Sequence, residues 1–513
     1  MVRKIWILVL AVFALAACTR GEIEPFHEEE EEPQQTIPEI GTDLINYYIE
    51  VDGKKYRPID DSGTMWFIRV PAGTDITSLV STFTHNAASV TIKEVEQESG
   101  VTVNNFSSIR NGLTYTLVSA TGETKDYTVK VIDTKMPVVS INTENSQKIK
   151  NREVWVPSTM RICNTDGSVT KLGNAEVRGR GNWTWEKYPK KPYAIKLEEK
   201  QEVLGMPKHK RWVLLAQYRG FIGNPLMFEA TRRAPLLGWA PRGCFVELVL
   251  NGKFQGLYYL CEQIKIDDNR VNITKLKDTD LTYPNISGGY MLEYDQVYDE
   301  EYKFTSSTFS LPVQLKAPDD SVPDAQFNYI RDFINDMEVE IKKIGTSQES
   351  HYRDYLDMEN FAEYWMVLET IGNYEAWKPR SVKMYKGRDG VDSPKGTVCK
   401  LKAGPLWDQE LFLVDHEFNT KDAHYFKYLF KDLDFVAAVK EHWQTYKSNI
   451  LGNDKYCSFL EYLDQIVDLI EYSAKRDLKF WGNGYFTLED EVATVRNGFV
   501  SKINWMDSKI KSF

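Results

Sequence analysis

Residues 246–265 read VELVLNGKFQGLYYLCEQIK, and this stretch decides the fold of the chain around it. Two runs rich in β-branched, aliphatic and aromatic residues, VELVL and GLYYL, stand on either side of Asn251-Gly252. Asn-Gly favours the type I′ turn of a two-residue β-hairpin, because both residues tolerate a positive φ. The stretch therefore predicts two antiparallel strands joined by a tight turn.

The chain on both sides of this hairpin divides into a β-rich and a helical part. From residue 137 to about 320 the pattern is mostly strand-like, and beyond residue 323 apolar residues recur at the helical spacings of three and four. Two such sets are Phe361, Tyr364, Trp365, Leu368 and Ile371, and Phe435, Val439, Trp443 and Tyr446. We therefore predict an α+β domain over residues 137–513, β-rich at 137–320 and helical at 321–513.

Residues 43–133 show the pattern of a separate all-β module. Short strand-like runs alternate with turns, and the runs at 113–118 and 127–132 flank Ala120-Thr121-Gly122-Glu123 as in a hairpin. The length suits a small immunoglobulin-like sandwich. The segments SGVTVNNF and LTYTLVSATGETKDYTVKVI also resemble Ig-like modules at the front of Bacteroidetes surface proteins. We interpret the module as a spacer or a binding domain.

The first 18 residues have the order of a bacterial signal peptide. Arg3 and Lys4 precede an apolar run that is too short to span a bilayer and that ends in Leu15-Ala16-Ala17-Cys18. This ending resembles a lipobox, which implies that Cys18 is diacylated and anchors the mature chain to a membrane of the cell envelope, at the outer membrane or cell surface. The alternative is an ordinary secretory signal with a chance cysteine. Residues 19–42, with a run of glutamates at 28–32, are predicted to be an acidic tether.

Composition excludes several classes of function. A net charge of −11 argues against nucleic acid as a partner, because non-specific nucleic-acid binding needs a cationic surface. No CxxC pair occurs and an odd number of cysteines remains after Cys18, so neither a zinc site nor a complete disulfide framework is predicted. The sequence contains no GxGxxG, GxxxxGK[ST], HExxH or GxSxG motif.

The first candidate site is the loop Arg178-Gly179-Arg180-Gly181-Asn182. Its glycines let the backbone turn tightly and present N–H groups, and its guanidinium groups offer paired donors to phosphate oxygens. Together with Lys196, the loop suits a polyphosphate group. The alternative is an exposed basic loop, since charged runs are usually solvated.

Three further clusters carry carboxylates. Glu262 closes an otherwise apolar strand, and if buried it needs a partner such as a phosphate-binding lysine. Glu375 follows the predicted helix at 361–371, which is where a catalytic-loop base would stand. Asp408 and Glu410, two apart on an extended segment, share one face and would suit Mg²⁺ or Mn²⁺. Each pattern taken alone is equally compatible with a solvated strand end or a surface turn.

In this order the segments resemble the CotH family of spore-coat and secreted kinases, over residues 137–411 and the helical tail beyond. The resemblance rests on RGRGNWTW (178–185), KKPYAIKL (190–197), RWVLLAQY (211–218), the hairpin at 246–265, GGYMLEYD (288–295), NYE (373–375), PRSVKMYK (379–386) and GPLWDQE (404–410).

The resemblance implies a two-lobed, atypical protein-kinase-like fold that binds ATP with Mg²⁺ or Mn²⁺ and phosphorylates hydroxyls of a protein substrate. It places Arg178, Arg180 and Lys196 near the nucleotide phosphates. Glu262 and Gln263 fall in the family's EQI motif. Glu375 stands where many members have the aspartate of an N-x-D sequence, and Asp408 is the first acid of their WDFD motif.

Two departures from the family pattern leave a second function open. Glu375 and Glu410 each replace an aspartate by a residue one methylene longer, and Mg²⁺ demands near-ideal octahedral geometry. The alternative to an active kinase is therefore a catalytically weak or inactive surface lipoprotein that keeps the kinase-like fold and acts in binding or adhesion.

Overall fold

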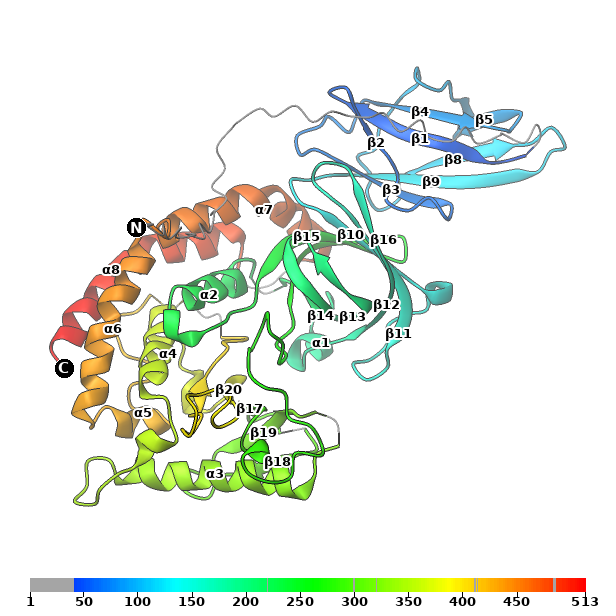
Figure 1. Cartoon of the computed structure of the whole chain (residues 1–513). Helices are drawn as coiled ribbons and strands as arrows, with labels where there is room; N and C mark the ends of the chain where they lie inside the picture. Colours follow the sequence, from blue (N-terminus) through cyan, green and yellow to red (C-terminus); the bar gives the residue numbers. More distant parts are fainter. Residues whose placement is uncertain are drawn as a thin grey trace, which may run out of the picture.

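The computed structural model describes residues 41–218, 220–298, 300–319, 321–409, 412, 414–482 and 486–513. Along the chain they form a β-sandwich, a closed β-barrel and a mixed region in which helices surround a further sheet (Figure 1). The predicted mixture of α and β structure is confirmed. Cys18, the glutamates at 28–32 and Glu410 lie outside the described residues.

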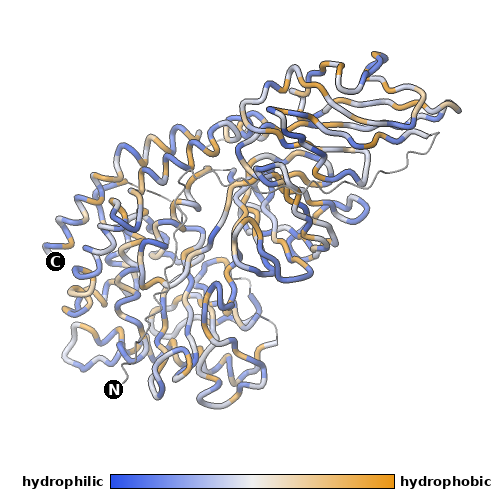
Figure 2. The backbone as a smooth tube through the Cα atoms, turned by 45° about the horizontal axis from the view of Figure 1, so that its top comes forward, coloured by the Kyte–Doolittle hydropathy of each residue, from blue (hydrophilic) through white to orange (hydrophobic). Residues whose placement is uncertain are grey.

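The first unit is a sandwich of two sheets, ordered β2-β1-β4-β7 and β3-β9-β8-β5-β6. Its strands are β1 (Leu44–Val51), β2 (Lys54–Tyr56), β3 (Met65–Val70), β4 (Leu79–His85), β5 (Ser89–Ile92), β6 (Val95–Glu96), β7 (Val103–Asn104), β8 (Leu113–Val118) and β9 (Thr124–Asp133). Hydrophilic and hydrophobic residues alternate along them (Figure 2). The Tyr47 and Tyr115 hydroxyls, 2.9 Å apart, join the two sheets in a shared core. The hairpin predicted across residues 120–123 is confirmed, with Val118 paired to Thr124.

The second unit is a closed barrel in the order β10-β11-β12-β13-β14-β16-β15. Its strands are β10 (Val138–Thr143), β11 (Val156–Cys163), β12 (Val169–Gly179), β13 (Tyr193–Val203), β14 (Met206–Leu215), β15 (Gly243–Leu250) and β16 (Lys253–Glu262). Asn251 and Gly252 join β15 to β16 with φ of 49° and 65°, so the predicted type I′ hairpin is confirmed. Two helices interrupt the barrel sequence, α1 (Trp183–Lys187) and α2 (Gly223–Arg232).

The third unit is a five-stranded sheet, β18-β19-β17-β20-β21, with helices packed around it. The strands are β17 (Tyr290–Tyr294), β18 (Lys303–Thr305), β19 (Pro312–Ala317), β20 (Val382–Lys386) and β21 (Lys402–Ala403). The helices are α3 (Asp324–Lys343), α4 (Met358–Ile371), α5 (His424–Leu429), α6 (Leu433–Leu451), α7 (Phe459–Trp481) and α8 (Leu488–Lys511). Both predicted helical sets, in α4 and α6, are confirmed. The predicted division is wrong at two places. Helix α2 lies in the part expected to be strand-like, and the strands β20 and β21 lie in the part expected to be helical.

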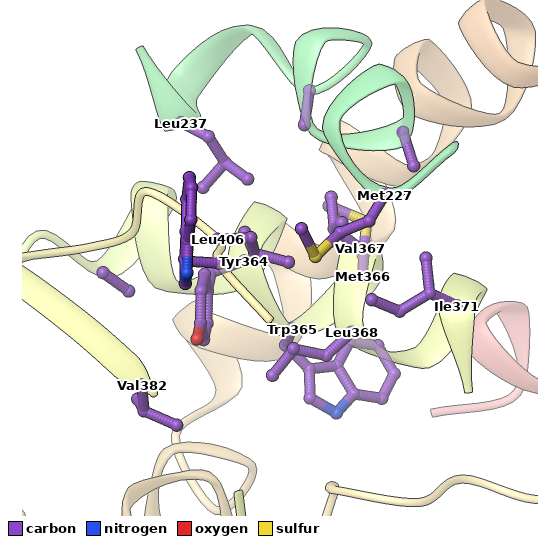
Figure 3. Packing of buried hydrophobic residues seen from close by; sticks show 14 of the residues in the cluster. Met227, Leu237, Tyr364, Trp365, Met366, Val367, Leu368, Ile371, Val382 and Leu406 are labelled. Carbon is purple, nitrogen blue, oxygen red and sulfur yellow. The ribbon is translucent and has the colours of Figure 1, made fainter. Parts of the chain in front are cut away.

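Helix α4 is the centre of this third unit. Its side chains pack against Met227 of α2 and against Leu406, which precedes Asp408 (Figure 3). The Asp357 carboxylate caps its first turn by accepting from Asn360 N at 3.1 Å. Gly372 ends it in the left-handed conformation, with φ of 69°, which glycine adopts without steric cost. The helix therefore stops at a fixed point and delivers residues 373–375 to the adjoining surface.

The three units are packed together through named contacts. Arg69 of the sandwich donates to the carbonyl oxygens of Met136 and Thr165 at 3.1 and 2.8 Å, and Arg476 of α7 bonds Asp133 at 3.1 Å. The buried Lys190, between α1 and β13, forms an ion pair of 2.7 Å with Asp477 of α7. The barrel is thus held on one side by the sandwich and on the other by the helices.

Two further features concern the membrane and the cysteines. Among the described residues, no helix combines the length and the apolar composition needed to cross a bilayer. The described cysteines are free thiols, and Cys163, Cys261 and Cys399 are buried, as expected for small hydrophobic residues.

Candidate active site

Two loops of the third unit deliver the two predicted catalytic carboxylates. Glu375 lies in the loop between α4 and β20, and Asp408 lies in the loop that follows β21. Strand β21 pairs with β20 in antiparallel fashion, and Gly404 N donates to Lys383 O at 2.8 Å. The loop before β20 and the loop after β21 therefore lie at the same end of these two strands. Asp408 takes a left-handed φ of 61°, which aspartate tolerates better than most residues.

Arg180 connects the barrel to this pair of loops. It follows β12 and lies over the ring of Trp407, with 5.0 Å between its guanidinium carbon and the ring centroid. Trp407 itself packs on Phe228 of α2 at 5.7 Å. Burial lowers the pKa of Arg180, and the negative charge of Asp408 opposes that effect. Arg180 and Asp408 therefore face one another across the junction between barrel and helical region.

Asp408 lies at this junction. Its side chain is exposed to solvent, yet burial by the surrounding protein is the main influence on it and raises its pKa, against the positive charges of Arg180 and Lys383. No described residue donates a hydrogen bond to its carboxylate, which leaves those oxygens available to a ligand.

Glu375 has the electrostatics of a base that works near neutral pH. Burial raises its pKa to about 7, and the neighbouring charge of Asp408 acts in the same direction. Arg380 opposes the shift, with its Nη1 3.9 Å from the Glu375 Oε1. A pKa close to the working pH is what general-base catalysis favours.

A neighbouring carboxylate, Glu293 of β17, forms ion pairs with two lysines. It stands directly opposite Lys383 of β20 in the antiparallel register, forms a salt bridge with it, and lies 3.4 Å from Lys316 of β19. Burial alone would raise the pKa of Glu293, but the two lysines outweigh it and lower the pKa to about 2. Glu293 is therefore ionised and paired.

Two buried amides tie the catalytic loops together, and we call them the amide clasp. Asn373 Oδ1 accepts from Glu375 N at 2.8 Å, and Asn373 Nδ2 donates to Gln409 O at 3.3 Å. Gln409 Nε2 in turn donates to Arg380 O at 2.5 Å. Since Gln409 follows Asp408 directly, the clasp fixes the spacing between Glu375 and Asp408.

The other predicted phosphate-binding residues lie on the outer face of the barrel. Arg178 is two residues before Arg180 on the same face, and its guanidinium lies 4.5 Å from the centroid of the Trp155 ring. Arg211 lies 4.9 Å from the same ring. Lys196 of β13 stands opposite Glu176 of β12 and forms an ion pair of 2.6 Å with it. Arg178 Nε is buried and has no partner within the described residues, which favours a role for this arginine in binding an anion.

Glu262, Gln263 and Asn182 have mainly local partners. Glu262 points into the end of the barrel, where its carboxylate accepts from Arg242 at 2.9 Å and lies 3.8 Å from Arg270. The partner of Glu262 is thus a pair of arginines and not the lysine considered from sequence. The Gln263 carbonyl accepts from Arg270, while its side-chain oxygen is buried and unpaired among described residues. Asn182 is exposed and accepts from Arg152.

The residues that sequence reasoning missed are Glu293, Lys383, Lys316, Trp407 and Gln409. Most belong to the segments GGYMLEYD, PRSVKMYK and GPLWDQE, which carried the family resemblance without an assigned role. The position of Lys383 opposite Glu293 depends on strand register, and no signal in the sequence specifies which strand lies beside which.

The donors present fit a divalent cation shared with a phosphate ligand. Within the described residues no three or more His, Cys, Asp or Glu side chains are placed to hold a metal by themselves. Mg²⁺, however, usually binds through one or two carboxylates together with substrate phosphates and water. Asp408 supplies such a carboxylate, and Arg180 stands beside it for the phosphates.

Comparison with known proteins gives one family match in the sandwich and one similarity among solved structures. A family model described as "SGBP, N-terminal" matches residues 47–131, and no curated protein matches the chain. Among solved structures, the chain is similar to the crystal structure of a candidate glycoside hydrolase from Bacteroides thetaiotaomicron, with 17% identity and a TM-score of 0.19. That match covers 42% of this chain and 60% of the other, and a similarity this weak carries no argument about fold or chemistry.

The catalytic loops and the end of β12 fall inside a third match. The family model described as "CotH kinase protein" covers residues 177–500, which is more than half of the chain and includes Arg180, Glu375 and Asp408. The chain belongs to the CotH kinase protein family.

Proposed function

We propose that the chain is an ATP- and metal-dependent protein kinase, held at the cell envelope by a lipid on Cys18, that phosphorylates Ser or Thr hydroxyls of a protein substrate. The observation that carries this proposal is the meeting of Arg180, from the barrel, with Asp408 and Glu375, from two loops of the helical region. Glu375 and Asp408 follow Arg180 by 195 and 228 positions in the sequence. Together these residues provide the positive and negative charges that phosphoryl transfer requires.

Each of these residues has a distinct task in the proposed reaction. The Glu375 carboxylate takes the proton of the acceptor hydroxyl while the hydroxyl oxygen bonds the γ-phosphorus of ATP and ADP leaves with the electron pair of the broken bond. Arg180 would neutralise phosphate charge as a bidentate donor. Asp408 would hold the divalent cation, which would offset charge on the phosphate oxygens.

Labelled ATP tests the proposal directly. The purified mature chain, incubated with [γ-³²P]ATP and Mn²⁺, is expected to transfer label to itself or to candidate envelope proteins, and the Asp408→Asn variant is not. No transfer, or equal transfer by the variant, would count against kinase activity.

A binding protein without turnover is the second candidate. The observation that favours it is the lack of a ready-made metal cluster among the described residues, together with the longer Glu375 side chain. In that case ATP with Mn²⁺ would leave the melting temperature unchanged, whereas a ligand of the native state raises it by mass action.

A further inference from the structure

Exposed aromatic side chains stand beside Glu375 and close to Arg180 in the sequence. Trp183, Tyr374 and Trp377 keep 61%, 53% and 49% of their surface exposed. Tyr374 and Trp377 flank Glu375 in the same loop, and Trp183 stands three residues after Arg180. Three residues of chain span at most ~11 Å, so the Trp183 backbone lies within that reach of Arg180. Tyr374 and Trp377 therefore accompany Glu375 on the helical side, and Trp183 accompanies Arg180 on the barrel side.

Trp377 is held in its exposed position. Its indole Nε1 donates to Asn419 O at 2.6 Å, and its carbonyl lies 2.8 Å from the His424 Nε2. Asn419 N in turn donates to the buried Glu369 of α4 at 2.6 Å. An exposed indole anchored by both main chain and side chain loses little conformational freedom when it contacts a partner. Such a side chain is suited to a binding surface.

Cations accompany these aromatics. Lys187 lies 5.6 Å from the Trp183 ring centroid, Lys378 follows Trp377 and is exposed, and Arg380 has 60% of its side chain exposed. Neither Lys187 nor Lys378 forms an ion pair with a described residue. In a chain with a net charge of −11, a surface that presents unpaired cations and aromatics beside the site selects acidic partners. We call these six residues the rim: Trp183, Lys187, Tyr374, Trp377, Lys378 and Arg380.

We propose that the rim binds the acceptor substrate, and that this substrate is an extended acidic polypeptide segment with an aromatic or aliphatic residue close to its Ser or Thr. The inference rests on the proposed kinase function and specifies its substrate class. Acidic side chains pair with Lys187, Lys378 and Arg380, while the apolar residue packs on Tyr374 or Trp377. The hydroxyl is thereby brought to Glu375, which lies between Tyr374 and Trp377 in the sequence.

A glycan is the competing class of acceptor, because aromatic side chains also form platforms for sugars. Neutral sugars carry no negative charge that could pair with the three cations of the rim. The rim therefore favours an acidic peptide. The experiment below includes a neutral oligosaccharide so that this alternative gives a distinct result.

Peptide binding without turnover tests the rim. Fluorescein-labelled Glu-Glu-Glu-Phe-Ser-Glu-Glu-Glu and its lysine counterpart are titrated with the full mature chain, and anisotropy is recorded. The acidic peptide is expected to bind at least about tenfold more tightly. Tyr374→Ala/Trp377→Ala and Lys378→Glu are each expected to weaken it about tenfold or more, and Lys378→Arg to retain it.

Tyr283→Ala is the matched control, because Tyr283 is an exposed aromatic, 67% accessible, that precedes the segment packed on α3. This variant is expected to bind the acidic peptide like the wild type. Equal or tighter binding of the lysine peptide, binding unaffected by the rim variants, or displacement by maltohexaose but not by unlabelled acidic peptide would overturn the proposal. Binding of ATP and Mn²⁺, followed separately by melting temperature, reports on the kinase function, so the two proposals fail by different measurements.

Discussion

Glu375 is the residue whose environment says most about the chemistry of the site. Burial and the charge of Asp408 raise its pKa, while Arg380 lowers it, and the balance lies at about 7. Small changes of charge nearby therefore alter how much of the carboxylate is ionised at neutral pH.

Replacing Arg380 gives a pH-dependent prediction. Arg380→Gln removes the positive charge that lowers the pKa of Glu375, so that pKa rises and the ionised base is reached only at higher pH. The acid limb of the pH profile of kcat is expected to move upward from about pH 7, measured with saturating ATP and acceptor. Arg380→Lys keeps the charge and serves as the control. An unchanged or lowered midpoint in Arg380→Gln would contradict the role of Glu375 as base.

The residues of the site differ in how far the sequence predicted them. Arg180, Glu375 and Asp408 were predicted individually, and the charge of Asp408 acts on both of the others. Glu293 and Lys383 were missed because their pairing depends on which strands are neighbours. Glu262 was expected to need a partner only if buried, and its partners, Arg242 and Arg270, are set by the closure of the barrel.

At the scale of elements, the amide clasp is the feature most open to test. Asn373 and Gln409 are almost fully buried, with exposed fractions of 0% and 1%, and they connect the loop after α4 to the loop after β21. Their hydrogen bonds connect the loops that carry Glu375 and Asp408.

Gln409→Leu breaks the bond to Arg380 O and keeps the side-chain volume similar. A misplacement of catalytic groups by about 1 Å can cost about 100-fold in rate, so kcat is expected to fall by one to two orders of magnitude. The midpoint of the pH profile is also expected to shift, because Glu375 changes its distance to Asp408, a result that mere loss of stability would not give. Gln409→Asn, which keeps an amide donor, is the polar control. Wild-type kcat and pH midpoint in Gln409→Leu would contradict the role of the clasp.

Elements with a strong local signal were predicted, and those defined by distant partners were not. The Asn251-Gly252 turn has the two positive φ angles that its sequence predicts, and α4 and α6 follow the apolar spacing. Helix α2 was missed because six of its ten residues are buried, which obscures the amphipathic pattern. Strand β20 was missed because its five residues show neither the helical nor the strand period of apolar residues. The strand is defined by its pairing with β17, which is distant in the sequence.

At the scale of the whole molecule, one buried ion pair connects the barrel to the helices. Lys190 and Asp477 are 0% and 4% exposed in their side chains, and Asp477 Oδ1 also accepts from Leu257 N at 2.9 Å. Because removal of one member leaves the other buried without its counter-charge, the pair holds the two parts in a fixed relation.

Lys190→Met is expected to lower the free energy of unfolding by about 3–5 kcal/mol, measured by denaturant titration. Burial already raises the pKa of Asp477 to about 6, and loss of Lys190 raises it further. A carboxyl group with a raised pKa in the folded state favours folding at low pH, so the loss should be smaller at pH 5 than at pH 8. Lys196→Met, which breaks an exposed ion pair, should cost about 1 kcal/mol or less. Equal losses in the two variants would contradict the structural role of Lys190.

The meeting of barrel and helical region at Arg180 and Asp408 is what the proposed activity depends on, and calorimetry of nucleotide binding measures it most directly. The wild type is expected to bind ATP in the presence of Mn²⁺ and at least about tenfold more weakly with EDTA. Arg180→Met and Asp408→Asn should each weaken binding with Mn²⁺ by about tenfold or more, with melting temperatures close to the wild type. Metal-independent binding, or wild-type affinity in both variants, would show that no metal–nucleotide site lies between these residues.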